Sequence, residues 1–264
     1  MNERKIIDMH AHIFPDKIVE KAVDTICGFY DIPMKGKGTT AELLECIREL
    51  NIERTLVHST ATKAEQVRSI NTYIIGEINA HSEFVGFGTL HPDYGDIEGE
   101  VEFMVRSGLK GVKLHPDFQR FNLDDERAQG IYKACSGKLP ILFHIGDYRQ
   151  DYSNPKRLYK MLEKYPELKV IAAHFGGWSV WEDGYEIFEP SENLYFDTSS
   201  SLYKIDTELV VKFIDKHGID KFLFGTDYPM WTAKEEIGRV EALGLTQYEQ
   251  ERIFYENAKE FLEL

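Results

Sequence analysis

The sequence lacks the features that would place the protein in a membrane, in an oxidising compartment or on nucleic acid. No apolar run approaches the roughly eighteen residues of a membrane-spanning helix, and no apolar leader precedes a cleavage site. The cysteines Cys27, Cys46 and Cys135 lie far apart with no Cys-x-x-Cys spacing, which predicts free thiols in a reducing, cytoplasmic environment. Basic residues are outnumbered 31 to 45, and the net charge of −14 argues against nucleic acid or an anionic membrane as a partner.

What the sequence has in abundance is short apolar runs that alternate with longer helical patterns. Such runs, rich in Ile, Val, Leu and Phe, suit parallel strands buried on both faces. The predicted strands cover residues 5–13, 54–60, 84–91, 111–115, 141–146, 170–175, 194–199 and 222–226. Helices are expected over residues 39–50, 65–81, 97–105, 124–135, 155–164, 206–216, 234–243 and 246–262.

Eight strand–helix units predict an α/β protein, a single (β/α)₈ TIM barrel over residues 1–264 with its site at the C-terminal ends of the strands. An open doubly wound sheet is the alternative, but no Gly-x-Gly-x-x-Gly turn supports it. Two stretches, residues 14–38 and 176–192, interrupt the alternation and are expected to be substrate loops or a lid. The alternative is that both are variable surface loops.

Polar side chains stand at the ends of several predicted strands. His10 and His12 end the first strand two residues apart, so alternation points both imidazoles the same way. His144, His174 and Asp227 end the fifth, sixth and eighth strands, each before a Gly or Pro turn. A barrel would bring these groups to one rim, where imidazole and carboxylate are suitable ligands for a divalent ion such as Zn²⁺. Packing alone explains them poorly, because each buried polar group would need a partner.

These strand ends carry motifs that resemble the amidohydrolase superfamily, in the branch of aminocarboxymuconate-semialdehyde decarboxylase. The motifs are Ile7-Asp8-Met9-His10-Ala11-His12, Gly111-Val112-Lys113-Leu114-His115-Pro116, Phe143-His144-Ile145-Gly146, Ala173-His174-Phe175-Gly176-Gly177, Phe224-Gly225-Thr226-Asp227-Tyr228-Pro229 and Asn257-Ala258. The resemblance implies that one zinc-like ion is held by His10, His12, His144 and Asp227. It places His174 beside the bound water or substrate, and Asp227 and His174 are the candidate acid–base residues.

Other residues near the predicted rim have two interpretations each. In binuclear relatives a fourth-strand lysine is carboxylated and bridges two ions, so Lys113 is a candidate bridge or else an ordinary paired lysine. His115, Arg149, Trp178 and Trp231 are candidate substrate contacts. The alternatives are a turn residue, a surface arginine, and aromatics packed against outer helices or a second subunit of a homodimer. The remaining histidines, His58, His81, His91 and His217, receive no role.

Three functions fit these residues. The leading hypothesis is a hydrolase that uses a zinc-activated water on a C–N or C–O bond of a small amide, cyclic amide or lactone. The second is a metal-dependent, non-oxidative decarboxylase of a small carboxylic acid, for which Arg149 is the candidate cation. The segment 14–38 is short for such a decarboxylase, which weakens that interpretation. The third is a barrel that binds metal or ligand without catalysis.

Overall fold

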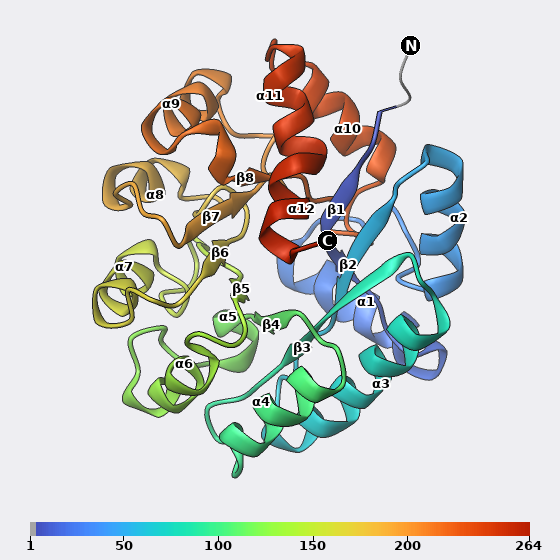
Figure 1. Ribbon diagram of the computed structural model, residues 1–264, viewed down its shortest axis with the longest axis vertical. Coiled ribbons are helices and arrows are strands. Elements are labelled where there is room, and N and C mark those ends of the chain that lie inside the picture. The colour runs from blue at the N-terminus through green and yellow to red at the C-terminus, as the bar shows by residue number, and fades with distance from the viewer. Residues whose placement is uncertain (1–3) are drawn as a thin grey trace.

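The computed structural model describes residues 4–264, and it has eight parallel strands in the order β1 to β8 around a central barrel (Figure 1). The strands are β1 (Ile7–His12), β2 (Arg54–His58), β3 (Phe84–Thr89), β4 (Gly111–Leu114), β5 (Ile141–Phe143), β6 (Val170–Ala172), β7 (Leu194–Asp197) and β8 (Phe222–Leu223). Hydrogen bonds from Met9 N to Phe224 O and from His12 N to Tyr228 O close the ring between β8 and β1. The predicted TIM barrel is therefore confirmed.

The helices form the outer layer around the barrel. They are α1 (Asp16–Tyr30), α2 (Thr40–Leu50), α3 (Val67–Ala80), α4 (Ile97–Arg106), α5 (Pro116–Gln119), α6 (Gln129–Cys135), α7 (Pro155–Lys164), α8 (Trp181–Ile187), α9 (Thr207–His217), α10 (Ala233–Glu241), α11 (Gln247–Glu251) and α12 (Asn257–Leu262). Short helical turns are η1 (Ala64–Gln66), η2 (Glu126–Ala128), η3 (Ile219–Lys221) and a π-turn, η4 (Arg252–Glu256). No helix among residues 4–264 is both long enough and apolar enough to cross a membrane.

All eight predicted strands exist, but each ends earlier than expected. The predicted strands 170–175 and 222–226 continue past the last paired residues of β6 and β8. Just beyond those ends the backbone turns into the left-handed region, with φ of 61° at His174 and 58° at Asp227. Non-glycine residues adopt this conformation rarely, and it often marks a functional position. The polar residues of β6 and β8 thus stand in the turns above the strands.

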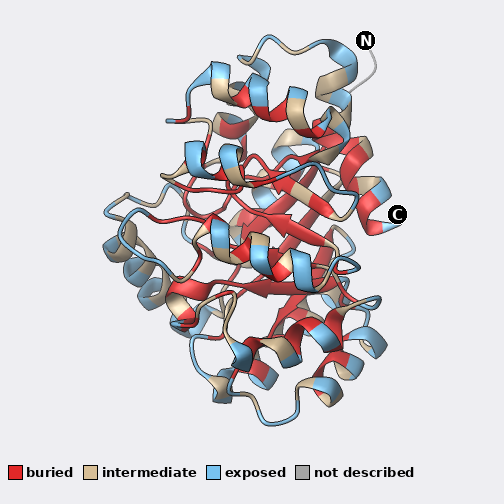
Figure 2. Cartoon of the chain, turned by 90° about the vertical axis from the view of Figure 1, so that its left-hand side faces the viewer, coloured by how far each residue is buried: buried red, intermediate tan, exposed pale blue. Residues whose placement is uncertain are grey.

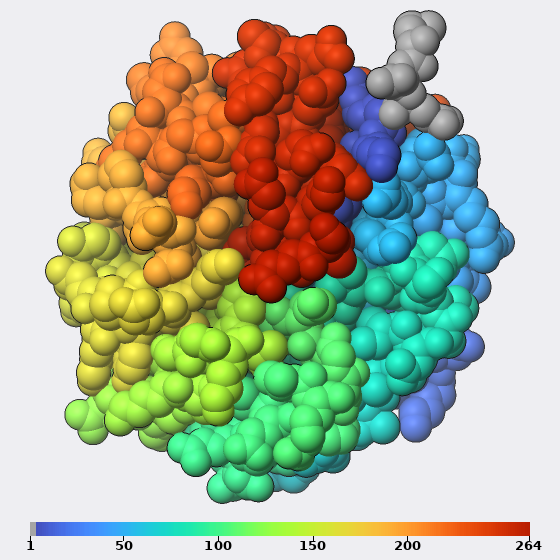
Figure 3. Space-filling view, viewed as in Figure 1, coloured from blue at the N-terminus to red at the C-terminus, as the bar shows by residue number. Residues whose placement is uncertain are grey.

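The interior of the barrel is apolar at its N-terminal end. Side chains such as Met9, Phe87 and Leu142 form one buried cluster there, and Ala258 and Phe261 of α12 complete it. The strands lie in a buried centre, whereas the helices expose their outer faces (Figure 2). Seen from the α12 side, the C-terminal segment covers the middle of the molecule (Figure 3). The barrel interior is therefore filled by apolar side chains at this end, and the polar strand-end residues lie at the opposite rim.

The two stretches expected to be loops both contain helices. Segment 14–38 includes the fifteen-residue α1, and segment 176–192 includes α8. Prolines and glycines concealed α1 in the sequence, yet a Cβ added at Gly28 would meet nothing within 4 Å, so this glycine sits in an open helical position. No residue of α1 is fully buried, which means that the helix rests on the rim instead of entering the core.

Candidate metal centre

The first strand carries a β-bulge that orients its polar residues. Pairing with β2 shifts register between Asp8 and Ala11. Met9 points into the interior cluster, whereas the Asp8 carboxylate accepts hydrogen bonds from the backbone N–H and hydroxyl of Thr226, at 3.0 and 2.6 Å. Because the bulge inserts an extra residue and breaks the alternation, Asp8 does not share the face of His10.

His10 and His12 converge on Asp227. The distance from Asp227 Oδ1 to His12 Nε2 is 3.2 Å, and to His10 Nε2 it is 3.4 Å. Burial by itself would raise the pKa of Asp227, but interaction with His10 and the hydrogen bond from His12 outweigh it and hold this pKa well below the usual range. Burial lowers the pKa of His10 to about 4 and lowers that of His12. The three residues thus offer one anion and two neutral imidazoles at neutral pH.

Asp197, at the end of β7, fixes the orientation of His10. Its Oδ2 lies 2.8 Å from His10 Nδ1. A carboxylate only accepts hydrogen bonds, so His10 Nδ1 carries the hydrogen and the lone pair of Nε2 points into the centre. There it accepts a hydrogen bond from Lys113 Nζ at 3.1 Å. Burial lowers the pKa of Lys113 to about 8, so at neutral pH an ammonium group occupies the space beside this lone pair.

His144 and His174 face each other in a way that calls for a cation. His144 Nε2 lies 2.9 Å from Gly146 O, and His174 Nδ1 lies 3.0 Å from Ser199 O, so both nitrogens donate to carbonyls. The remaining nitrogens, His144 Nδ1 and His174 Nε2, then present lone pairs to each other at 3.0 Å. Burial lowers the pKa of both imidazoles, which disfavours a shared proton. These residues therefore fit a divalent ion, because an ion bound to His144 Nδ1 would remove the opposition of the two lone pairs.

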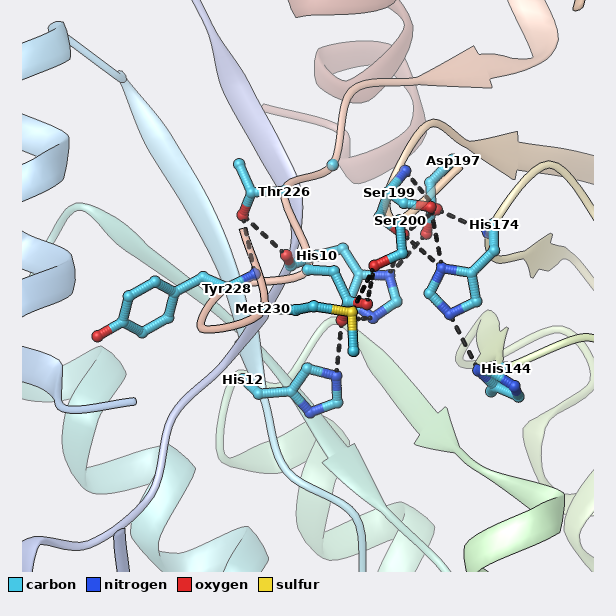
Figure 4. Close-up of polar contacts among 12 residues, drawn as sticks. His10, His12, His144, His174, Asp197, Ser199, Ser200, Thr226, Tyr228 and Met230 are labelled. Carbon is cyan, nitrogen blue, oxygen red and sulfur yellow. Dashed lines mark hydrogen bonds and ion pairs between the residues drawn. The ribbon is translucent and has the colours of Figure 1, made fainter. Parts of the chain in front are cut away.

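The close-up shows how these residues are arranged (Figure 4). His174 lies between His10 and His144, with ring centroids at 5.2 and 4.8 Å, and His12 lies on the other side of His10 at 5.3 Å. The structure thus brings all five predicted strand-end residues to one rim. His144 joins the group by its contact with His174, whose Nε2 lies 3.0 Å from His144 Nδ1.

A small pocket opens above this group at the C-terminal rim. Its floor is polar and its upper wall is mostly apolar. The lining residues are His12, Ile26, Tyr30, Met34, Lys113, His115, Phe118, His144, His174, Asp227, Pro229 and Met230. Ile26 and Tyr30 belong to α1, so the helix concealed in the sequence forms part of the wall. Tyr30 Oη lies 2.8 Å from His115 Nε2.

The predicted substrate contacts separate into one residue that lines the pocket and three that lie behind it. His115 lines the pocket and stacks on His144, with centroids 4.0 Å apart. Arg149 forms two hydrogen bonds with the Asp147 carboxylate, at 2.9 and 2.7 Å, so its guanidinium is already engaged. Trp178 packs behind Tyr30, with ring centroids 4.9 Å apart. That His115, Arg149 and Trp178 contact substrate stays a prediction.

Trp231 also lies behind the pocket wall. Its indole N–H donates to Ser200 Oγ at 2.9 Å, and Ser200 Oγ donates to Asp227 Oδ2 at 2.5 Å. We expect Trp231→Ala to lower the free energy of unfolding by about 3–5 kcal/mol, as large-to-small core changes do. Trp231→Phe, the control, keeps most of the packing on Tyr203 and should cost about 1 kcal/mol. Denaturant unfolding measures both, and wild-type stability with a raised KM in the alanine variant would instead place Trp231 in the pocket.

Sequence reasoning missed three residues of this centre. Asp197 ends β7 and His58 ends β2, so the rule that selected His144 and His174 applied to them as well. Both were passed over because they lie outside the recognised motifs. Tyr30 was hidden in the segment expected to be a loop.

A TIM barrel that gathers neutral histidines and carboxylates around one pocket at its C-terminal rim defines a class, the metal-dependent barrel enzymes. Within that class the chain belongs to the amidohydrolase family, whose model matches residues 7–264, and it is an enzyme of the hydrolase or decarboxylase type. The family resemblance of the strand-end motifs is thereby confirmed. No curated protein matches the chain in sequence.

Solved structures share the fold over nearly the whole chain. 5-Carboxyvanillate decarboxylase LigW from Sphingomonas paucimobilis is 14% identical, with 100% of each chain covered and a TM-score of 0.75. A dihydroxybenzoic acid decarboxylase from Polaromonas sp. JS666, solved with bound manganese and 2-nitroresorcinol, is 17% identical, with 99% of this chain and 97% of the other covered and a TM-score of 0.76. A putative amidohydrolase from Staphylococcus aureus is 17% identical, with 98% and 100% covered and a TM-score of 0.74.

Proposed function

We propose that the protein is a metal-dependent, non-oxidative decarboxylase of a small carboxylic acid. The observation that carries this proposal is Lys113, a fully buried cation in the wall of the pocket beside the candidate metal ligands. The Lys113 ammonium offers a substrate carboxylate a positive charge inside the pocket, and a divalent ion held beside it would add to that charge. Arg149, the cation expected from the sequence, is engaged by Asp147, and Lys113 takes its place in the proposal.

The apolar wall supports loss of carbon dioxide. Ile26, Met34, Phe118 and Met230 face the polar floor across the pocket. An apolar wall solvates a carboxylate poorly and neutral carbon dioxide well, so it favours the step in which the charge leaves the carboxyl group. The names of two solved structures with this fold also describe decarboxylases, of 5-carboxyvanillate and of dihydroxybenzoic acid.

In this proposal His10, His12, His144 and Asp227 hold one divalent ion, with Zn²⁺ the metal that the nitrogen-rich donor set favours. A divalent ion bound there supplies a Lewis acid that withdraws electron density from the substrate's oxygen atoms. Asp197 keeps the lone pair of His10 directed at the centre. The three free thiols support residence in the reducing cytoplasm.

His174 moves the proton that the reaction consumes. When the bond between the carboxyl group and its neighbouring carbon breaks, the electron pair stays on that carbon, carbon dioxide leaves, and one proton is added. His174 Nδ1 is committed to Ser199 O, so Nε2 is the atom that takes a proton from solvent and delivers it to carbon. Lys113 offers the substrate carboxylate a charge-assisted hydrogen bond before the bond breaks.

Hydrolysis of a small amide or lactone is the second candidate. The observation that favours it is the position of the Asp227 carboxylate between His10 and His12, where it could also accept a proton from water. Its strongly lowered pKa makes it a weak base, and we therefore rank hydrolysis second.

The proposal is tested by incubating the zinc- or manganese-loaded protein with a panel of aromatic and unsaturated carboxylic acids, lactones and cyclic amides. We expect carbon dioxide release from at least one acid, at a rate that depends on the added ion. Lys113→Met should lose most of that activity, because it removes the cation and keeps the length of the side chain. Turnover of a lactone or amide with no carbon dioxide from any acid would contradict decarboxylation and favour hydrolysis.

A further inference from the structure

His58 is the one histidine of the centre that has no protein partner among the described residues. It ends β2 directly opposite His12 in the strand register, and it is completely buried. Neither Nδ1 nor Nε2 has a hydrogen-bond partner within residues 4–264. A neutral imidazole has one N–H and one lone pair, so leaving both unpaired in the interior is unfavourable.

The other imidazoles of the centre each have a nitrogen tied to the protein. His10 donates to Asp197, His144 to Gly146 O and His174 to Ser199 O, and His115 pairs with Tyr30. In His10, His144 and His174 those bonds leave the second nitrogen directed at the centre, whereas His115 Nδ1 accepts a further bond from Phe118 N. His58 lacks such a tie, so protein hydrogen bonds do not explain its position.

The position of His58 does fit an ion that it shares with the first strand. Its ring centroid lies 4.4 Å from that of His12 and 4.9 Å from that of His10. One nitrogen from each of the three rings lies within 4.8 Å of the others. Two nitrogens bound to one zinc ion at about 2.0–2.1 Å lie roughly 3 Å apart in a site of four or five ligands, so the rings have to rotate toward one another by on the order of 1 Å.

We propose that His58 is a further ligand of the divalent ion, reached from β2 beside His10 and His12. This inference rests on the proposed function, because it assumes that the centre holds an ion. It adds an imidazole to the donor set and thereby shifts the preference of the site from manganese and magnesium, which suit oxygen ligands, toward zinc and cobalt.

The experiment measures zinc and manganese affinities of the folded protein by competition with a chromophoric chelator. We expect His58→Phe, which keeps a buried ring and removes both nitrogens, to weaken zinc binding at least tenfold and manganese binding by a smaller factor. The absorption spectrum of the cobalt-loaded variant should also differ from that of the wild type. The control is His217→Phe, since His217 Nε2 is also buried without a partner but lies on α9, with its ring 4.8 Å from that of Phe196.

Each outcome separates the inference from the proposal beneath it. Zinc affinity equal to that of the wild type in His58→Phe overturns the inference and leaves the proposed function standing, and so does equal weakening in His58→Phe and His217→Phe. A wild-type protein that binds no divalent ion overturns both. If His58→Phe does not fold, magnetic resonance of the wild-type protein with cadmium and isotope-labelled histidine decides. A coupling from cadmium to His58 supports the inference, and its absence while His10 and His12 show couplings overturns it.

Discussion

Replacing His12 with alanine will remove most of the divalent ion from the purified protein and nearly all of its activity. Wild-type protein should carry about one ion per chain. His12 Nε2 and His10 Nε2 lie at 3.2 and 3.4 Å from the same oxygen of Asp227, so removing one imidazole takes away a ligand that the others cannot replace. Loss of an outer partner alone costs 10–100-fold in metal affinity, and loss of a ligand should cost at least about 100-fold. Elemental analysis after gel filtration measures this directly.

A control for His12→Ala is His81→Ala, because His81 is a partly exposed residue at the end of α3, near the start of β3. It should keep a full complement of ion. Wild-type protein without metal, and without uptake when Zn²⁺ or Mn²⁺ is added, would rule out the metal centre. Two ions per chain would point to a carboxylated Lys113 that bridges them.

The second large effect separates His174 from His144. We expect His174→Asn to keep its ion and to lose about 10²–10⁴-fold in turnover, the usual range for a general acid–base residue. His144→Asn should lose ion as well as turnover. The contact of 3.0 Å between His174 Nε2 and His144 Nδ1 makes this comparison informative, because both nitrogens are close enough to serve one ion.

The measurement pairs elemental analysis with single-turnover kinetics at saturating metal. Asparagine is the matched replacement at both positions, since it is polar, uncharged and smaller than histidine. Equal loss of ion from both variants would make His174 a ligand, and another group would then have to deliver the proton.

The fold could be predicted because a short apolar run marks each strand in the sequence. Apolar runs buried on both faces, such as β6 and β7, are read from composition alone. The strand ends could not be placed, because the apolar runs continue past the last paired residues, Ala172 of β6 and Leu223 of β8. The left-handed conformations at His174 and Asp227 are ones that non-glycine residues seldom adopt. The helix α1 was missed because the glycines and prolines in and around it favoured a loop, although its apolar residues recur at helical spacing.

The part of the site that could be predicted consists of residues that lie in the recognised motifs. His10, His12, His174 and Asp227 gather where strand-end reasoning expected them. The orientation of Asp8 was not accessible, because a bulge in the strand leaves no mark in the sequence. The depth of Lys113 likewise depends on packing between segments that are distant in sequence, whereas the pairing of Arg149 with Asp147 is local and was overlooked.

The apolar cluster that α12 completes fills the barrel at its N-terminal end. In the proposed reaction, substrate and product would therefore both pass through the pocket at the C-terminal rim, which Ile26 and Tyr30 of α1 help to line. We expect the organic product to compete with fresh substrate for this pocket, so that turnover slows as product accumulates.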